Sequence, residues 1–138
     1  MQTRLNPYIS FRGDAREALE FYQSAFGGKL EMTTLEEGGS PHEPNEADWL
    51  MHGMLTADNG MVLMCSDAPM GMAFEKGSRI SISLSGDDEK EITGFYEKLS
   101  SDGTIVEPLR KAPWGDTFGM FTDKFGIFWM VNITAQSE

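Results

Sequence analysis

The chain has 138 residues and a mass of 15.4 kDa, the size of one ordinary domain. It carries 11 basic and 22 acidic residues, and the net charge of −11 argues against binding to nucleic acids or to anionic membranes. Hydrophobic residues make up 40% of the chain, which is enough for a packed core and excludes wholesale disorder.

The single cysteine, Cys65, cannot form an internal disulfide, so we expect a reducing compartment and a cytoplasmic protein. The first residues hold no apolar run of the signal-peptide type. No stretch approaches the roughly 18–20 apolar residues of a membrane span. We therefore expect neither a signal peptide nor a membrane-spanning segment.

The first half of the chain begins with a strand, a helix and a second strand. The first strand is expected over residues 6–11. A capping box over residues 14–17 opens the helix, and Gly27 and Gly28 end it before a strand over residues 29–35. Apolar residues recur on one helical face at Ala18, Leu19, Tyr22, Ala25 and Phe26.

A loop and a hairpin complete this half. Residues 36–48 show no hydrophobic period and contain five acids, which predicts a long mobile loop that is either a solvated face or a lid attracting a cationic ligand. Two apolar runs follow, over residues 49–57 and 61–66. The Asn59-Gly60 pair between them is a strong hairpin signal.

The same order of patterns then starts again. A half-buried strand is expected over residues 79–85, and a second capping box over residues 88–91 opens a helix. A strand over residues 104–109 follows, and a second hairpin has arms over residues 117–123 and 127–133.

The two halves align with each other. An offset of 74 places Asp14 on Asp88 and the Phe21-Tyr22 pair on Phe95-Tyr96. An offset of 66 aligns residues 53–64 with residues 119–130 without a gap, with identical Gly, Met, Thr, Gly and Met. Since both matches occur in the same order, we infer a duplication into two βαβββ modules, about 4–66 and 79–134, within one domain of residues 1–138.

Two such modules in a short chain resemble the vicinal oxygen chelate superfamily of glyoxalases, bleomycin-resistance proteins and dioxygenases, and within it the PhnB-like group. The segments that carry the resemblance are residues 7–11, 17–22, 26–28, 64–67 and 122–132. The most specific of them is Thr-Asp-Lys-Phe-Gly-Ile-Phe-Trp-Met-Val-Asn, residues 122–132.

The resemblance implies an α+β fold in which paired modules form a cupped, partly open β-barrel, usually completed as a homodimer. It also implies a site inside the cup. In metal-dependent relatives, His, Gln or Glu ligands come from the first and last strands of each module.

Spacing from the helix motif and from the turn glycines places the metal-ligand positions at poor donors. These positions are Pro7, Leu63, Ser81 and Trp129. Zn, Fe, Ni and Mn sites need imidazole, carboxylate or thiolate groups, and the chain has two histidines in all. We therefore predict no metal and no cofactor.

The aromatic candidates for a ligand site lie in the second half. Trp129 is either core packing or an aromatic platform inside the cup. Trp114 is either ordinary packing or part of a pocket rim or dimer surface. Phe118 would add a second platform.

Three further candidates lie in the first half. His52 is either a partly buried strand-end residue or a pocket acid/base, because its ordinary pKa lies near neutral pH. Alternation along the strand groups it with Met54, whose thioether either fills the core or lines an adaptable pocket. Asp67 either caps a turn or points at a ligand amine.

Four functions remain open. The first is a metal-independent small-molecule-binding protein whose ligand is apolar and carries a positive group. The second is a metal-free acid/base enzyme, isomerase- or lyase-like, that uses His52. A ubiquinone-pathway methyltransferase is disfavoured, because the chain has neither a glycine-rich nucleotide fingerprint nor room for a doubly wound domain. The fourth is a structural dimer with a filled cup.

Overall fold

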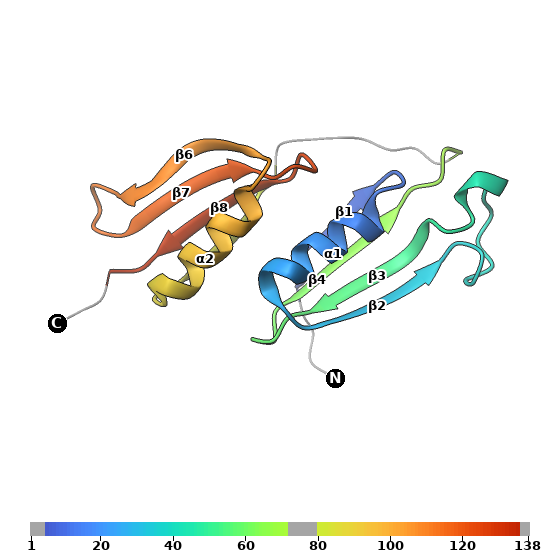
Figure 1. The fold of residues 1–138 in the computed structure, drawn as a ribbon, viewed down its shortest axis with the longest axis horizontal. Helices are drawn as coiled ribbons and strands as arrows, with labels where there is room; N and C mark the ends of the chain where they lie inside the picture. Colours follow the sequence, from blue (N-terminus) through green and yellow to red (C-terminus); the bar gives the residue numbers. More distant parts are fainter. Residues whose placement is uncertain (1–4, 72–79, 136–138) are drawn as a thin grey trace. The chain divides into compact units, whose positions relative to one another are not determined.

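The computed structural model describes residues 5–71 and 80–135, which divide into two compact units, Met1–Lys76 and Gly77–Glu138. The predicted module ends at residues 4 and 79 lie outside the described residues. Each unit contains a four-stranded sheet and one α-helix in the order βαβββ (Figure 1). The α+β class and the two βαβββ modules predicted from the sequence are confirmed.

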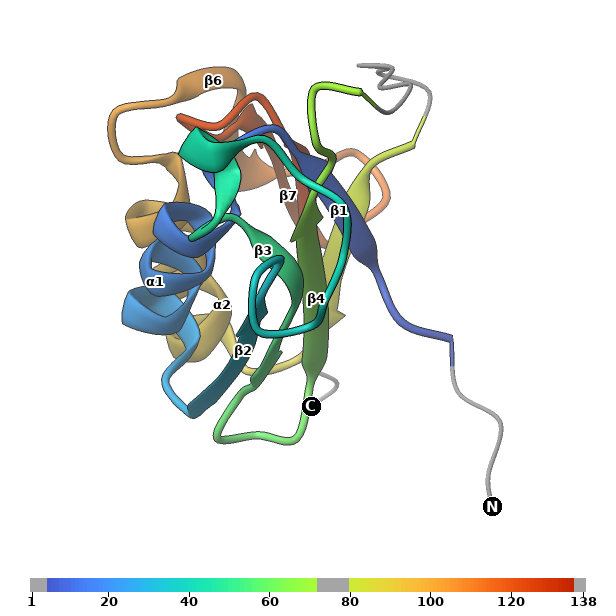
Figure 2. The same ribbon diagram turned by 90° about the vertical axis from the view of Figure 1, so that its right-hand side faces the viewer.

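The first unit is built from five main elements. They are β1 (Tyr8–Phe11), α1 (Ala15–Phe26), β2 (Lys29–Thr34), β3 (Leu50–Thr56) and β4 (Val62–Asp67). Its strand order is β1-β4-β3-β2, in which β1 pairs with β4 in parallel and the other pairs are antiparallel. Figure 2 shows α1 on one side of this sheet.

The second unit repeats this topology. Its elements are β5 (Ile82–Gly86), α2 (Glu89–Ser100), β6 (Thr104–Lys111), β7 (Thr117–Thr122) and β8 (Phe128–Ile133). The strand order is β5-β8-β7-β6, again with one parallel pair, β5 with β8. Within the described ranges both sheets are open, and neither closes into a barrel. The cup implied by the resemblance concerns the pairing of modules and stays a prediction.

The duplication extends to individual turn bonds. In the β3–β4 turn, Gly60 N–H donates to Ala57 C=O at 2.9 Å, and in the β7–β8 turn Gly126 N–H donates to Asp123 C=O at 2.9 Å. Both glycines have positive φ, +93° and +86°, which ordinary residues rarely adopt. The predicted Asn59-Gly60 hairpin is therefore confirmed.

Each unit has its own core between helix and sheet. In the first unit Leu19 and Tyr22 of α1 are fully buried, as are Leu55 and Cys65 of the sheet. The second core centres on residues Tyr96, Leu99, Phe121, Trp129 and Val131. Strand side chains alternate between this core and the opposite face, as expected for sheets covered on one side.

The start of α1 differs from the predicted capping box. The Asp14 side chain makes no capping hydrogen bond. Asp67, at the end of β4, accepts the N–H groups of Gly13 at 2.7 Å and Ala15 at 3.0 Å instead. In α2 the predicted local cap is confirmed, because Asp88 accepts the N–H of Glu91 at 3.0 Å.

Residues 36–48 form a loop, as the sequence predicts, and its mobility stays a prediction. The segment contains a 3-10 turn, η1 (Pro44–Glu46), closed by reciprocal hydrogen bonds between Glu43 and Glu46. Leu35 N–H donates to Trp49 C=O at 2.7 Å, which closes the base of the loop. Hydrogen bonds between polar groups of the loop hold this structure. Because they involve no regular pattern of apolar residues, the sequence did not predict the 3-10 turn.

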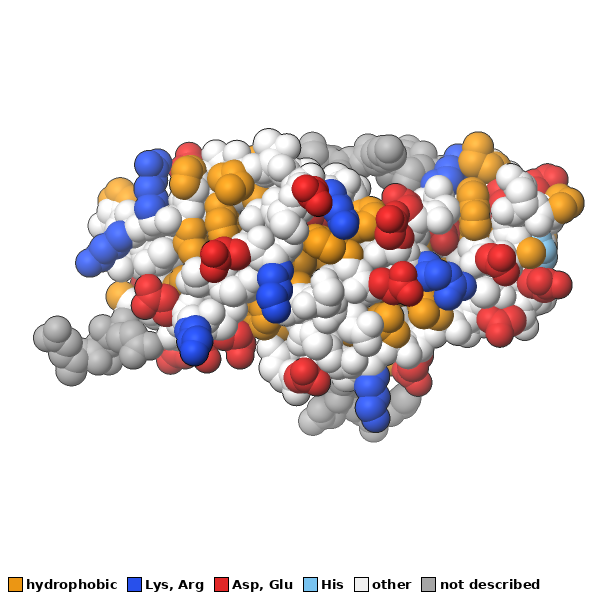
Figure 3. All heavy atoms as spheres, in the orientation of Figure 1, with side chains coloured by type: hydrophobic (Ala, Val, Ile, Leu, Met, Phe, Trp, Pro, Cys, Tyr) orange, Lys and Arg blue, Asp and Glu red, His pale blue; other side chains and the backbone are white. Residues whose placement is uncertain are grey.

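Acidic side chains are spread over the visible face of both units (Figure 3). In the described part of the chain no helix combines the length and apolar character needed to cross a membrane.

Candidate functional site

Each sheet has one face packed on the helix of its own unit and one face without it, which we call the helix-free face. In β4, Leu63 and Cys65 are buried beneath α1, whereas Val62, Met64 and Ser66 point the other way and are half-buried. Because side chains alternate along a strand, the register of the sheet decides which residues share the helix-free face.

A row of four residues crosses the helix-free face of the first unit. Tyr8 of β1 is the Cα partner of Met64, Met64 is the partner of Met54 in β3, and Met54 is the partner of Glu31 in β2. Directly paired residues project to the same side of a sheet, so the two thioethers lie between a phenol and a carboxylate.

His52 lies next to this row. It is two residues before Met54 in β3, so it shares the helix-free face, as the alternation predicts. Its Nδ1 atom is 3.5 Å from the Tyr8 hydroxyl oxygen, and the two ring centroids are 5.9 Å apart. The face therefore brings together two groups that can exchange protons with a bound molecule.

The second unit carries the equivalent row. Ser83 of β5 is the partner of Met130, Met130 is the partner of Met120 in β7, and Met120 is the partner of Glu107 in β6. Both rows thus read hydroxyl, methionine, methionine, glutamate. The Ser81 hydroxyl adds a hydrogen bond to the Met130 sulfur at 3.2 Å.

Trp114 and Phe118 form an aromatic pair at one end of the second unit. Trp114 lies in the turn between β6 and β7 and is 62% exposed. Its ring meets that of Phe118 edge-on, with centroids 5.6 Å apart. Phe118 is two residues before Met120 in β7, so it extends the helix-free face toward Trp114.

Trp129 lies on the opposite face from the one expected of a ligand platform. It is 1% exposed, stacks on Phe121 with centroids 6.3 Å apart, and donates from Nε1 to Asp123 at 2.9 Å. Phe121 in turn packs edge-on against Tyr96 of α2. The indole is therefore a core residue between the sheet and α2, and the residue after it, Met130, faces outward.

Asp67 is a structural residue in this geometry. It is 5% exposed, and besides the two bonds to the start of α1 its second carboxylate oxygen accepts the N–H of Leu50 at 2.9 Å. Three backbone donors satisfy the buried carboxylate, which joins α1, β3 and β4. Its two oxygens are occupied by these bonds, which favours the capping interpretation over a ligand amine.

The donor chemistry does not fit the divalent metals of metal-dependent relatives. On the first and last strands of each unit, the helix-free face carries hydroxyl, thioether, amide and apolar side chains. These residues are Tyr8, Ser10, Val62, Met64, Ser66, Ser83, Ser85, Phe128, Met130 and Asn132. Such ions need imidazole, carboxylate or thiolate groups. Among the described residues no group of three or more His, Cys, Asp or Glu side chains is placed to hold a metal ion.

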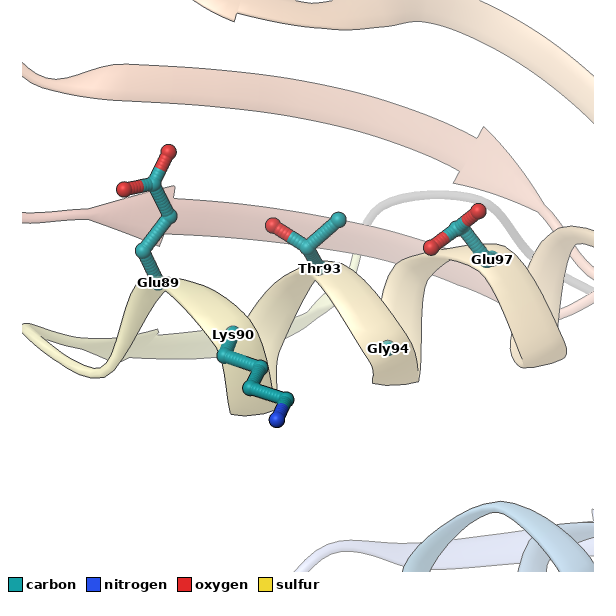
Figure 4. A pocket seen from close by; sticks show the side chains of 5 residues that line it. All are labelled: Glu89, Lys90, Thr93, Gly94 and Glu97. Carbon is teal, nitrogen blue, oxygen red and sulfur yellow. The ribbon is translucent and has the colours of Figure 1, made fainter.

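A hollow along α2 is a weaker candidate. It is lined by Glu89, Lys90, Thr93, Gly94 and Glu97, as Figure 4 shows. All five lie on one helix, and the three charged residues among them are exposed. A cleft that binds a small molecule is normally walled by several elements and largely apolar.

Two βαβββ units, each with a four-stranded mixed sheet covered by one helix, define a protein of the glyoxalase-like fold. The chain belongs to the Glyoxalase/Bleomycin resistance protein/Dioxygenase superfamily, whose family model matches residues 4–131.

Three proteins are similar to this chain over nearly its whole length. Protein YjdN of Escherichia coli K12 is 30% identical over 144 residues, covering 96% of both chains. The crystal structure of protein PA1353 from Pseudomonas aeruginosa is 36% identical, with a TM-score of 0.83 and coverage of 98% of this chain and 100% of that one. A PhnB protein from Bacillus cereus is 26% identical, with a TM-score of 0.73 and coverage of 96% and 100%.

Sequence reasoning identified His52, Met54 and Phe118 on the helix-free faces but missed the rest of the rows. The missed residues are Tyr8, Glu31, Met64, Ser83, Glu107, Met120 and Met130. A signal was present, because the offset of 66 places Met54 on Met120 and Met64 on Met130. Glu31 and Glu107 gave no such signal, because an offset of 66 does not align them with each other. Only strand pairing shows that they belong to the rows.

Proposed function

We propose that this protein is a metal-independent small-molecule-binding protein of the glyoxalase/bleomycin-resistance type, with a largely apolar ligand bound on the helix-free faces. The observation that carries the proposal is the helix-free face of the first and last strands, which carries thioethers and hydroxyls rather than the imidazole, carboxylate or thiolate groups that such metals need. Flexible, polarisable methionines suit surfaces that adapt to apolar ligands.

The aromatic and charged surroundings support the same proposal. Trp114 and Phe118 offer ring surface beside the second row, and Tyr8 does so in the first. The net charge of −11 would attract a ligand with a positive group.

The test uses protein labelled with ¹³C at the methionine methyl groups. We expect 4-phenylbutanol to shift the signals of Met54, Met64, Met120 and Met130. Met32 serves as the control, because its sulfur lies near Arg16 of α1 at 3.9 Å, on the side of the helix. Shifts that are confined to Met32, or an unchanged spectrum, would contradict the proposal.

Metal independence is tested on the same protein. Elemental analysis of untreated protein is expected to give well under one transition metal per chain. The titration curve with 4-phenylbutanol is expected to be unchanged after dialysis against EDTA. A stoichiometric metal whose removal abolishes binding would overturn this part of the proposal.

A second candidate is a metal-free acid/base enzyme, isomerase- or lyase-like, with His52 as the proton carrier. The approach of the Tyr8 hydroxyl to His52 Nδ1 at 3.5 Å favours it, because a neighbouring hydrogen-bonding group can orient an imidazole for proton transfer. It requires a substrate whose turnover is abolished by His52→Ala while the methionine shifts persist. Turnover that survives the substitution would exclude this role.

The Bacillus cereus relative is described as a putative 3-demethylubiquinone-9 3-methyltransferase. Both sheets of the present chain are mixed, with one parallel and two antiparallel pairs each, unlike the parallel doubly wound sheet that often binds nucleotide-like cofactors. We expect calorimetry to detect no binding of S-adenosylmethionine. Stoichiometric heat would reopen that activity.

A further inference from the structure

The two helix-free faces carry rows with the same order of chemical groups, but the surroundings of the glutamate differ between them. In the second unit Glu107 forms an ion pair with Arg110, with Oε2 and Nη2 3.1 Å apart. In the first unit Glu31 has no cationic partner within ion-pair distance among the residues that the structure describes. Glu107 thus has a cationic neighbour at ion-pair distance, whereas no such neighbour of Glu31 lies among the described residues.

We propose that the duplicated faces have diverged in charge selectivity, and that the first unit binds the positively charged end of an elongated apolar amine with Glu31 as the counter-charge. The second unit binds without regard to charge, because Arg110 already compensates Glu107. This inference rests on the proposed function and names the ligand class of one of its faces.

The geometry of the row sets the shape of that ligand. Glu31 and Tyr8 lie on the two outer strands of the first sheet, with Met54 and Met64 between them. Adjacent strands are about 4.8 Å apart, so three spacings separate the carboxylate strand from the phenol strand by about 14 Å. An ammonium group at Glu31 therefore requires an apolar body that extends over both thioethers.

The far end of the row can contact the other end of such a molecule. Tyr8 is 51% exposed, and its hydroxyl lies 3.5 Å from His52 Nδ1. An aromatic or polar terminus has both a ring surface and hydrogen-bonding atoms there. A simple inorganic cation would use none of these features, which is why we assign an amphipathic amine to this face.

The test compares three probes that share a phenylbutyl body, namely 4-phenylbutylamine, 4-phenylbutanol and 4-phenylbutyrate. Methionine methyl signals report the two faces separately, Met54 and Met64 for the first and Met120 and Met130 for the second. At the first face we expect the amine to bind about two- to five-fold more tightly than the alcohol, the range of an exposed ion pair. High salt should reduce this preference by screening.

Glu31→Gln and Glu107→Gln are the matched variants. Each removes one negative charge, so any effect of the overall charge is equal in the two proteins. We expect Glu31→Gln to abolish the preference for the amine at the first face, and Glu107→Gln to leave that preference intact. Unchanged circular dichroism spectra and urea midpoints in both variants verify that the fold is preserved.

The outcomes separate this inference from the function on which it rests. If all three probes bind but the preference for the amine survives Glu31→Gln, or is equal at both faces, the charge selectivity assigned to Glu31 is wrong and the binding function stands. If no probe shifts any of the four methionines, the binding function fails, and the inference fails with it.

Discussion

At the scale of single residues, Asp67 joins the start of α1 to the strands β3 and β4. Its buried carboxylate accepts three backbone N–H groups, from Gly13, Ala15 and Leu50. Asp67→Ala leaves these donors without their partner, and we expect a loss of about 2–4 kcal/mol in the free energy of unfolding. Urea denaturation measures it.

Asp14→Ala is the control for this substitution. The Asp14 side chain makes no capping bond, so its loss is expected to change stability by less than about 0.5 kcal/mol. Equal effects of the two substitutions would show that the cap at Asp67 does not operate in solution.

Glu46 gives the first unit a dependence on pH. The side chain is 1% exposed, and its pKa is lowered from 4.5 because the N–H groups of Glu43 and Met70 donate to the carboxylate. A lowered folded-state pKa means that the carboxylate stabilises the fold above the unfolded pKa. This contribution is lost as pH falls through the folded pKa.

The difference in the free energy of unfolding between wild type and Glu46→Gln, here called the stability gap, is expected to depend on pH. Since protonated Glu46 resembles glutamine, we expect the gap to be largest near neutral pH and to close as the medium is acidified below about pH 4. Urea midpoints across this range measure it, and a gap that stays constant with pH would contradict the assignment.

At the scale of elements, one glycine on a central strand of each sheet lets the helix pack closely. A Cβ atom added at Gly53 would collide with Leu19 Cδ1 of α1, and one at Gly119 would lie 2.9 Å from Tyr96 Cε2 of α2. This close approach explains why the aligned residues 53–64 and 119–130 begin with the same residue.

Gly53→Ala is therefore expected to be destabilising by about 1–3 kcal/mol, because Leu19 is fully buried and has little room to shift. Gly94→Ala is the matched control. Gly94 lies within α2 with nothing within 4 Å of an added Cβ, so alanine should stabilise the protein by up to about 1 kcal/mol. Thermal or urea unfolding distinguishes the signs, and stabilisation by Gly53→Ala would refute the packing argument.

At the scale of the whole molecule, we propose a homodimer, as the resemblance to the superfamily implies. The outer strand β6 supports it, because Ile105 and Val106 are 52% and 48% exposed at a sheet edge. Light scattering is expected to give twice the chain mass of 15.4 kDa, and Val106→Asp is expected to shift the protein toward the monomer. A monomeric mass for the wild type at micromolar concentration would refute the dimer.

Local patterns in the amino-acid sequence were enough to predict the duplicated architecture. Capping and turn signals lie within a few residues of one another, so the helices, both hairpins and the order βαβββ could be predicted from local patterns. The family resemblance rested on the same segments. Cytoplasmic location and the unit boundaries stay predictions.

Which strand face is helix-free follows from strand pairing and helix packing, which local patterns do not reveal. The side-chain period of a strand is two, so a displacement of one residue exchanges the faces. The spacing argument selected Leu63 and Trp129, whereas the paired sheets turn these residues toward the helices and direct Met64 and Met130 outward. The cap at Asp67 escaped prediction for a related reason, because it joins residues more than fifty positions apart in the chain.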